Sequence, residues 1–210
     1  MEIMKQMEQL GVVPVVVLDQ VKDALPLAKA MQAGGVPCAE VTLRTAAGLA
    51  SIEAMRQMDN MLVGAGTVIT LDQCKDALAA GAQFIVSPGT NVKVVEHCLA
   101  NNVPVLPGCV TPTEIMTMME LGIDTFKFFP ANVYGGLNAM KALAGPFGSI
   151  KFIPTGGVNG DNLGEYLSAP FIRAVGGSWL CAKADVNAGN FDKITQLCAQ
   201  SALVVAASRK

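Results

Sequence analysis

The stretch VPVLPGCVTPTEIMTMMELGIDTFKFFP, residues 103–130, contains a complete strand–helix–strand unit. Two short apolar runs, Val103–Pro107 and Thr125–Phe129, have the length and composition of buried strands. Between them, Pro112–Leu121 has helical periodicity, and a glycine closes the expected helix. Two strands joined by a helix in this way run parallel to each other. The stretch therefore predicts a parallel sheet of the α/β class.

The same unit recurs along the chain. Further strands are expected over Val12–Leu18, Ala39–Leu43, Met61–Ala65, Phe84–Ser87, Lys151–Pro154 and Ile172–Val175. Further helices are expected over Lys22–Ala33, Ala46–Met58, Leu71–Ala80 and Val92–Asn101. Eight strands alternating with helices in 210 residues predict a compact (β/α)₈ TIM barrel. An open doubly wound sheet is the alternative, although the glycine-rich turn that normally follows its first strand is missing here.

We expect one domain over residues 1–210, because no linker, repeat or low-complexity segment divides the chain. The first ten residues, MEIMKQMEQL, are too polar for a secretory signal, and their apolar spacing predicts an amphipathic N-terminal helix. Hydrophobic residues make up 51% of the chain, yet no apolar run approaches the ~20 residues of a membrane span. This composition suits strands buried on both faces by covering helices.

Charge and residue usage narrow the function. A formal net charge of −2 and a pI near 5.4 give no basic patch for nucleic acid. The six cysteines lack C-x-x-C spacing, which indicates buried free thiols in a reducing cytoplasm. His97 is the only histidine, which excludes multi-histidine metal sites, and its place on the expected helix 92–101 favours a surface or packing role over Ser-His or Cys-His catalysis. Acid–base chemistry must therefore depend on carboxylates, lysine or groups of the substrate.

Lys127 is an amine inside an apolar strand, between two phenylalanines. Burying an ammonium group is costly, so a buried lysine is expected to have a counter-charge or to be neutral. A neutral lysine is a nucleophile that forms Schiff bases with carbonyl substrates. The structural alternative is a lysine that snorkels from a strand end to solvent. Lys151 also has apolar neighbours, but it lies near the start of its strand, so Lys127 is the better candidate.

Strand alternation gives Lys127 possible partners. Glu40 and Arg44 share one face of their strand, and Lys127 and Phe129 share one face of theirs. If the barrel prediction holds, these polar faces point inward and the chemistry lies at the carboxyl ends of the strands. A glutamate beside Lys127 can relay protons, and an arginine near the mouth can bind a carboxylate. A purely structural ion pair between Glu40 and Arg44 is the alternative.

Glycine clusters follow the last two expected strands, at 156–157 and at 176–178. Barrel enzymes often bind phosphate at this place, through backbone N–H groups and a helix N-terminus. Tight turns alone would also account for the glycines. Because two clusters follow the two appropriate strands, we expect a phosphate site there.

Five motifs then occur in order along nearly the whole chain. They are EVTLRT (40–45), GAGTV (64–68), FKFFPA (126–131), PTGG (154–157) and GGSW (176–179). In these motifs the sequence resembles the bacterial 2-keto-3-deoxy-6-phosphogluconate (KDPG) aldolases, which also cleave 4-hydroxy-2-oxoglutarate (KHG). The resemblance implies a homotrimeric (β/α)₈ Schiff-base aldolase that acts on small 2-keto acids without a metal or other cofactor. It implies no nucleic-acid or membrane partner, and a cytoplasmic enzyme.

The resemblance also implies roles for individual residues. Lys127 corresponds to the Schiff-base lysine and Glu40 to the catalytic acid–base. Substrate-binding residues are implied at Arg44, Thr67, Pro88, Thr155 and Phe129. A phosphate site is implied at Gly156, Gly157, Gly177 and Ser178. We therefore expect a lyase that cleaves KDPG to pyruvate and glyceraldehyde 3-phosphate, and KHG to pyruvate and glyoxylate. The alternatives are a phosphosugar enzyme on the same barrel without Schiff-base chemistry, and a non-catalytic barrel module.

Overall fold

The structure is a computed structural model and describes residues 2–209. Its strands are β1 (Val12–Val16), β2 (Cys38–Thr42), β3 (Leu62–Gly66), β4 (Ile85–Val86), β5 (Val105–Leu106), β6 (Thr125–Phe128), β7 (Lys151–Pro154) and β8 (Val175–Gly177). Its helices are α1 (Glu2–Leu10), η1 (Val21–Asp23), α2 (Ala24–Ala33), α3 (Gly48–Met55), α4 (Leu71–Ala79), α5 (Val92–Ala100), α6 (Pro112–Glu120), α7 (Gly136–Phe147), α8 (Leu163–Leu167), η2 (Trp179–Cys181), α9 (Lys183–Asn187) and α10 (Phe191–Ser208).

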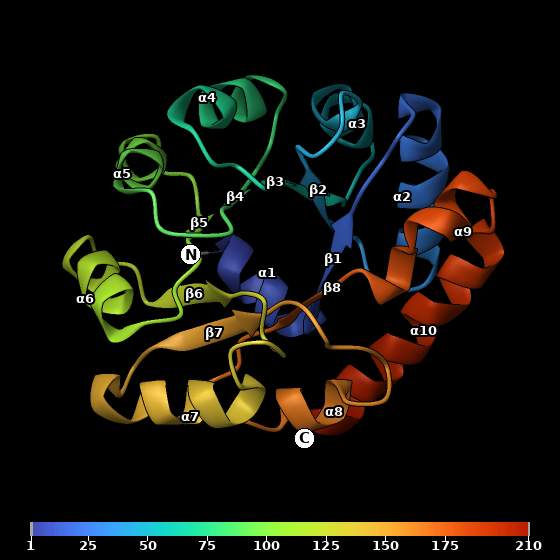
Figure 1. Ribbon diagram of the computed structural model, residues 1–210. Helices are drawn as coiled ribbons and strands as arrows, with labels where there is room; N and C mark the ends of the chain where they lie inside the picture. Colours follow the sequence, from blue (N-terminus) through green and yellow to red (C-terminus); the bar gives the residue numbers. More distant parts are fainter. Residues whose placement is uncertain (1, 210) are drawn as a thin grey trace.

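All paired strands run parallel, which confirms the predicted α/β class. One six-stranded sheet has the order β5-β4-β3-β2-β1-β8, and β6 pairs with β7 in a second sheet. Isolated bridges join the two sheets, at Gly108–Lys127 on one side and at Phe152–Ile172 and Thr155–Gly176 on the other. The helices from α2 onward surround the strands (Figure 1). The sequential strand order lacks the reversal of a doubly wound sheet, so the structure does not support that alternative.

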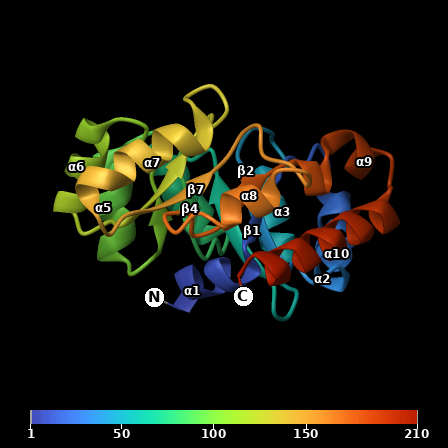
Figure 2. The same ribbon diagram turned by 90° about the horizontal axis from the view of Figure 1, so that it is seen from below.

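Strand side chains alternate between two apolar clusters, as the sequence predicts. Outward side chains pack against the helices, and among them are Val12, Val41, Val63, Phe126, Phe128 and Phe152. The opposite faces contribute Val13, Cys38, Leu62, Phe84, Ile153 and Ala174 to a second cluster, which Met7 of α1 joins. The predicted N-terminal helix is therefore confirmed, and it packs on the same side of the molecule as the end of α10 (Figure 2).

Several element boundaries differ from prediction for local reasons. The expected strand at 103–107 shortens to β5, because the Val103 N–H donates to the Cys98 carbonyl at the end of α5, at 2.9 Å. The expected strand at 172–175 moves to Val175–Gly177, because the Ile172 N–H closes a turn onto Ala169, at 3.0 Å. Gly176 and Gly177 therefore lie within β8 rather than after it.

Two long helices were not predicted. Helix α7 begins after Gly135 and contains Pro146, so both of its ends carry residues that usually interrupt helices. Helix α10 extends over 18 residues and packs against α2 and α8.

Within residues 2–209, no helix combines the length and apolar character needed to cross a bilayer.

Candidate active site

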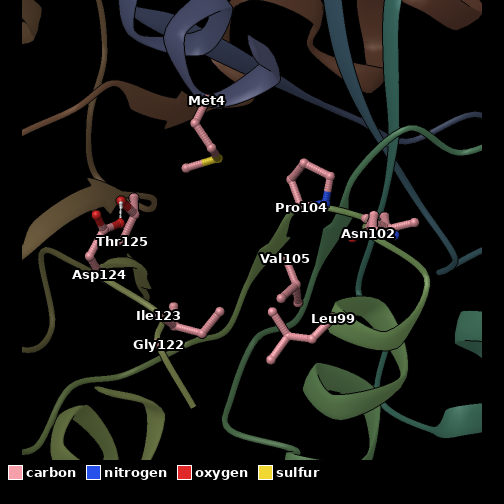
Figure 3. A pocket seen from close by; sticks show the side chains of 10 residues that line it. Met4, Leu99, Asn102, Pro104, Val105, Gly122, Ile123, Asp124 and Thr125 are labelled. Carbon is pink, nitrogen blue, oxygen red and sulfur yellow. Dashed lines mark hydrogen bonds between the residues drawn. The ribbon is translucent and has the colours of Figure 1, made fainter. Parts of the chain in front are cut away.

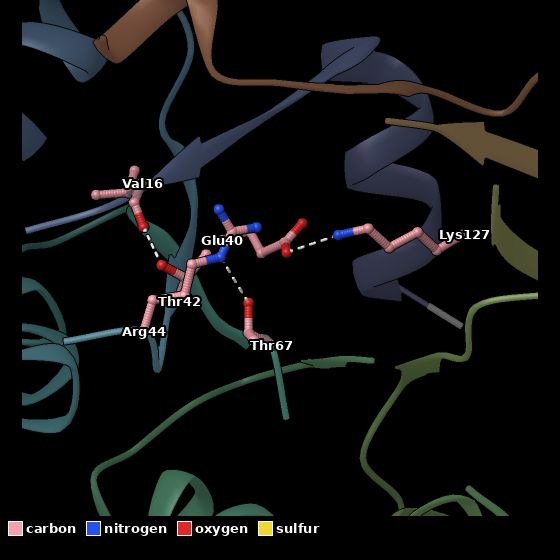
Figure 4. Close-up of polar contacts among 6 residues, drawn as sticks. All are labelled: Val16, Glu40, Thr42, Arg44, Thr67 and Lys127. Carbon is pink, nitrogen blue, oxygen red and sulfur yellow. Dashed lines mark hydrogen bonds and ion pairs between the residues drawn. The ribbon is translucent and has the colours of Figure 1, made fainter. Parts of the chain in front are cut away.

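Lys127 and Glu40 form the centre of the site. The Lys127 Nζ of β6 donates to Glu40 Oε1 of β2 at 2.9 Å, although the two residues are 87 positions apart (Figure 4). Their side chains are 5% and 3% exposed, respectively. The ring centroid of Phe129 lies 5.5 Å from the Lys127 Nζ. A side chain so deeply buried does not reach solvent, so the snorkelling alternative is wrong.

The sheet explains why these two side chains meet. Lys127 is in register with Ile153, and Glu40 follows Cys38 by two residues on its strand, so all four side chains share the inner face. Ile153 and Cys38 belong to the inner apolar cluster, which fills the space toward the amino ends. Lys127 and Glu40 therefore lie between this apolar cluster and the carboxyl ends of the strands. Removing one partner of such a buried pair would leave the other charge uncompensated, at a cost of about 3–5 kcal/mol.

Gly66 makes room for the Glu40 side chain. A Cβ at this last position of β3 would lie 2.3 Å from Glu40 Oε1, far inside contact distance. Gly66 is in register with Thr42, so the neighbouring strand places its backbone directly beside the carboxylate. The sequence prediction did not assign this role to Gly66. A glycine at the end of a strand is the available signal, but its meaning depends on the register between strands.

Arg44 and Thr67 form a second contact at the carboxyl ends of β2 and β3. Arg44 Nε donates to Thr67 Oγ1 at 3.2 Å, while Glu40 pairs with Lys127 (Figure 4). The Glu40–Arg44 ion pair that the sequence left open therefore does not form. Thr67 has φ of 58°, a left-handed conformation that is rare for a β-branched residue. Backbone strain of this kind concentrates at functional sites, where the surrounding structure holds it in place.

Thr155 and Pro88 lie at the ends of other strands. The Thr155 hydroxyl, directly after β7, is buried, and it has no hydrogen-bond partner among residues 2–209. A buried hydroxyl without a partner costs about 1–3 kcal/mol, so this position suits a polar group of a ligand. Pro88 follows β4, and its carbonyl oxygen would lie 2.2 Å from a Cβ at Gly108, so the loops after β4 and β5 touch.

The residues after β7 and β8 surround a cavity of about 400 Å³. Its lining consists of Val15, Val17, Arg44, Val158, Ser178, Trp179, Cys181, Ala182 and Lys183. We call it the strand-end cavity. Gly156 and Gly157 precede Val158 with φ of 97° and 77°, which only glycine adopts readily. The structure thus brings Arg44, Ser178 and the glycine turn to one region, and it adds Lys183, which the sequence prediction missed.

A second cavity lies at the opposite ends of the strands. It has about 390 Å³, and its lining includes Met4 of α1 and residues around the start of β6 (Figure 3). In it the Thr125 hydroxyl donates to Asp124 Oδ1 at 2.7 Å. Because its lining comes from α1, the end of α5 and the residues that lead into β5 and β6, this cavity lies at the amino ends of the strands, the stability end.

All six cysteine thiols are buried, as predicted. Burial raises the pKa of Cys109 to about 12 and the pKa of Cys198 to about 12, which keeps both thiols protonated and unreactive. Within residues 2–209, no three His, Cys, Asp or Glu side chains gather in a way that could hold a metal ion. His97 is half-buried on helix α5, which contributes neither Lys127 nor Glu40.

A lysine in direct contact with a carboxylate, on parallel strands, is a nucleophile with its own proton acceptor, the pair that Schiff-base chemistry requires. The class that this chemistry and the comparisons below point to is the Schiff-base carbon–carbon lyases. The comparisons agree with this class. Residues 3–197 match the family "KDPG and KHG aldolase", and the chain belongs to that family.

Relatives and solved structures cover nearly the whole chain. A 2-dehydro-3-deoxy-phosphogluconate aldolase of Treponema pallidum is 47% identical over 204 residues, 97% of each chain. A KHG/KDPG aldolase of Escherichia coli is 41% identical over 191 residues, 90% of each chain. A crystal structure of KDPG aldolase from Legionella pneumophila, with pyruvate captured as a covalent carbinolamine, has a TM-score of 0.87 and 42% identity, covering 90% of this chain and 92% of that one.

Proposed function

We propose that this protein is a Schiff-base aldolase that cleaves KDPG to pyruvate and glyceraldehyde 3-phosphate, and KHG to pyruvate and glyoxylate. The observation that carries the proposal is the buried contact between Lys127 Nζ and Glu40 Oε1, at 2.9 Å. Neither a phosphosugar enzyme without an imine nor a non-catalytic module needs a buried lysine with its own proton acceptor. The names of the relatives favour the aldolase as well.

The reaction begins with a proton transfer. The Lys127 ammonium gives a proton to the Glu40 carboxylate across their hydrogen bond, which leaves a neutral amine. The amine attacks the C2 ketone of the substrate and forms a carbinolamine. Glu40 then returns its proton to the leaving hydroxyl group, so that water departs and an iminium remains.

Cleavage follows from the iminium. The Glu40 carboxylate takes the proton of the C4 hydroxyl, the C3–C4 bond breaks, and its electrons move into the iminium to give an enamine. The C4 fragment leaves as an aldehyde. Glu40 returns the proton to C3 of the enamine, and water hydrolyses the resulting imine to release pyruvate and free Lys127.

Other residues orient the substrate in this proposal. Arg44 and Thr67 bind the carboxylate of the pyruvate portion, because the exposed guanidinium presents a fork of N–H donors at the mouth. Thr155, Pro88 and Phe129 line the same pocket. The Thr155 hydroxyl, which has no hydrogen-bond partner in the described part of the chain, supports a polar contact to the substrate.

The far end of KDPG lies in the strand-end cavity. Its phosphate is bound by backbone N–H groups of Gly156, Gly157, Gly177 and Ser178. The positive φ angles of the two glycines after β7 suit a concave backbone that can approach an anion closely.

Borohydride trapping tests the proposed function. The protein is incubated with pyruvate and borohydride, digested, and the reduced adduct is mapped by mass spectrometry. We expect an adduct of one pyruvate on Lys127. An adduct on Lys151, or no adduct while the protein is folded, would overturn the Schiff-base mechanism.

The remaining proposals concern architecture and context. We propose that residues 1–210 form one domain in which the eight strands close into a (β/α)₈ barrel, supported by the bridges at both junctions between the two sheets. By family resemblance we also propose a cytoplasmic homotrimer. Sedimentation equilibrium would contradict the trimer if the mass corresponded to one or two chains.

A further inference from the structure

Asp19 and Lys183 form a charge pair beside the strand-end cavity. Lys183 Nζ lies 2.9 Å from Asp19 Oδ1, and Asn187 Nδ2 donates to the other carboxylate oxygen at 3.0 Å. Asp19 follows β1, whereas Lys183 and Asn187 lie on α9. Lys183 lines the same cavity as Arg44 and Ser178. The lysine therefore belongs to the region where the aldehyde end of the substrate lies in the proposed function.

The pair is held but remains accessible. The side chains of Lys183 and Asp19 are 50% and 38% exposed, respectively. Hydrogen bonds from Lys183 and then Asn187 hold the pKa of Asp19 below its usual value, so the carboxylate stays charged at neutral pH. An ammonium has three N–H donors, and its contact with Asp19 leaves others for a second anion. Lys183 can therefore contact a phosphate in the cavity while it keeps its contact with Asp19.

We propose that Lys183 is a specificity-determining residue that binds the phosphate of the substrate, and that Asp19 weakens this contact by competing for the same ammonium. The inference rests on the proposed aldolase function and extends it to the choice between phosphorylated and unphosphorylated substrates. Lys183 attracts the phosphate dianion, whereas Asp19 partly neutralises Lys183 and repels the dianion. A substrate without phosphate experiences neither effect.

Opposite shifts are expected for the two charges. Lys183→Gln removes the attraction, so the ratio of kcat/KM for KDPG to kcat/KM for unphosphorylated 2-keto-3-deoxygluconate should fall about three- to tenfold. Asp19→Asn removes the competitor, so the same ratio should rise about two- to fivefold. Both shifts should shrink at high salt, because the charges are partly exposed.

A double-mutant cycle tests whether the two charges act on each other. If Asp19 acts through Lys183, Asp19→Asn should raise the ratio of the two kcat/KM values much less in the Lys183→Gln background than in the unmodified protein. Asp72→Asn is the matched control, because Asp72 pairs with Lys75 at 3.9 Å in an exposed helical pair and its loss changes the net charge equally. The control should leave the substrate ratio unchanged.

The outcomes separate this inference from the proposed function. If the unmodified protein gives no pyruvate adduct and cleaves neither substrate, the aldolase proposal itself fails. If it cleaves both but Lys183→Gln leaves the ratio within about twofold, the role of Lys183 is overturned. An equal rise from Asp19→Asn in both backgrounds would overturn the competition between the two residues. A falling ratio with Lys183→Gln and a non-additive cycle would support the whole inference.

Discussion

Two lysines on neighbouring strands show how position decides chemistry. Lys127 and Lys151 both lie in apolar strands, and the register pairs Lys127 with Ile153 and Lys151 with Thr125. Lys127 is buried and donates to Glu40, whereas Lys151 is half-buried and donates to the Pro170 carbonyl. The register therefore places Lys127 two residues closer to the carboxyl ends of the strands than Lys151, beside the Glu40 carboxylate. Lys151 lies at the amino end of β7, where its ammonium group donates to the backbone carbonyl of Pro170.

The difference shows that an apolar sequence context does not by itself identify a reactive lysine. Both side chains share the inward direction by strand alternation. What separates them is the partner that the neighbouring strands supply at each level. At the carboxyl ends the partner is an acid that can accept and return a proton, and at the amino ends it is a fixed carbonyl that cannot.

The largest expected effect concerns the two lysines themselves. Lys127→Arg keeps the positive charge opposite Glu40 but cannot form an imine, so kcat for KDPG should fall by about 10⁴-fold or more. Lys151→Arg is the matched control and should leave kcat within about twofold, because its hydrogen bond to a carbonyl has no role in the chemistry. Steady-state kinetics and borohydride trapping on both variants measure this.

Comparable losses of kcat in Lys127→Arg and Lys151→Arg would contradict the assignment of the Schiff base to Lys127 alone. Circular dichroism and thermal unfolding keep the comparison interpretable, since both changes preserve charge and should preserve the fold.

The second effect concerns the acids at the two ends. Glu40→Gln can still accept the hydrogen bond from Lys127 but cannot take its proton, so kcat should fall about 10²–10⁴-fold. Asp124→Asn, in the cavity at the amino ends, should leave kcat within about twofold, since the Asp124 carboxylate accepts from the neighbouring Thr125 hydroxyl and an amide oxygen can accept the same bond. The rate of adduct trapping should fall with the first change alone. Trapping at the normal rate in Glu40→Gln would exclude Glu40 as the proton acceptor.

Much of this comparison could be predicted from the sequence. Alternation with a period of two placed Glu40, Arg44 and Lys127 on inward faces, because that period follows from strand geometry alone. The repeated strand–helix unit gave the parallel α/β class. The position of Lys151 near the start of its strand was also sufficient to rank it below Lys127.

Other features depend on pairings that a single sequence does not define. The role of Gly66 follows from its register beside Thr42, and the pair of Asp19 and Lys183 follows from how α9 returns to the end of β1. The sequence left Glu40 with two possible partners, and only the three-dimensional arrangement selects Lys127 over Arg44. Helix α7 was missed because its flanking glycines and internal proline contradict its helical propensity.

A smaller effect is expected from adding a methyl group beside Glu40. In Gly66→Ala the new Cβ would lie 2.3 Å from Glu40 Oε1, so the carboxylate must leave the position in which it accepts from Lys127. Displacements of about 1 Å at a reacting group can cost up to about 10²-fold, and we expect kcat to fall about 10- to 100-fold. Gly89→Ala is the control at the same end of the strands, because within residues 2–209 no atom other than those of Gly89 and its chain neighbours lies within 4 Å of the added Cβ. Equal kcat values for the two variants would show that Glu40 tolerates displacement.

The smallest effect concerns a lysine–acid pair at the surface, in which the lysine is exposed and the acid is half-buried, in contrast to the fully buried Lys127–Glu40 pair. Lys193 Nζ lies 2.8 Å from Asp185 Oδ2 with the lysine 57% exposed, and hydrogen bonds from Lys193 and then Asn190 lower the pKa of Asp185. A carboxyl group with a lowered pKa in the folded state stabilises the fold above its unfolded pKa of about 3.9, and this contribution disappears as the pH falls through the folded pKa. Asp185→Asn should therefore lower Tm by no more than about 2 °C at pH 7 and leave kcat unchanged, and its Tm should approach that of the unmodified protein as the pH falls through the folded pKa of Asp185. Calorimetry across this pH range measures the gap, and a gap that persists at the lowest pH would show that the charge of Asp185 is not its source.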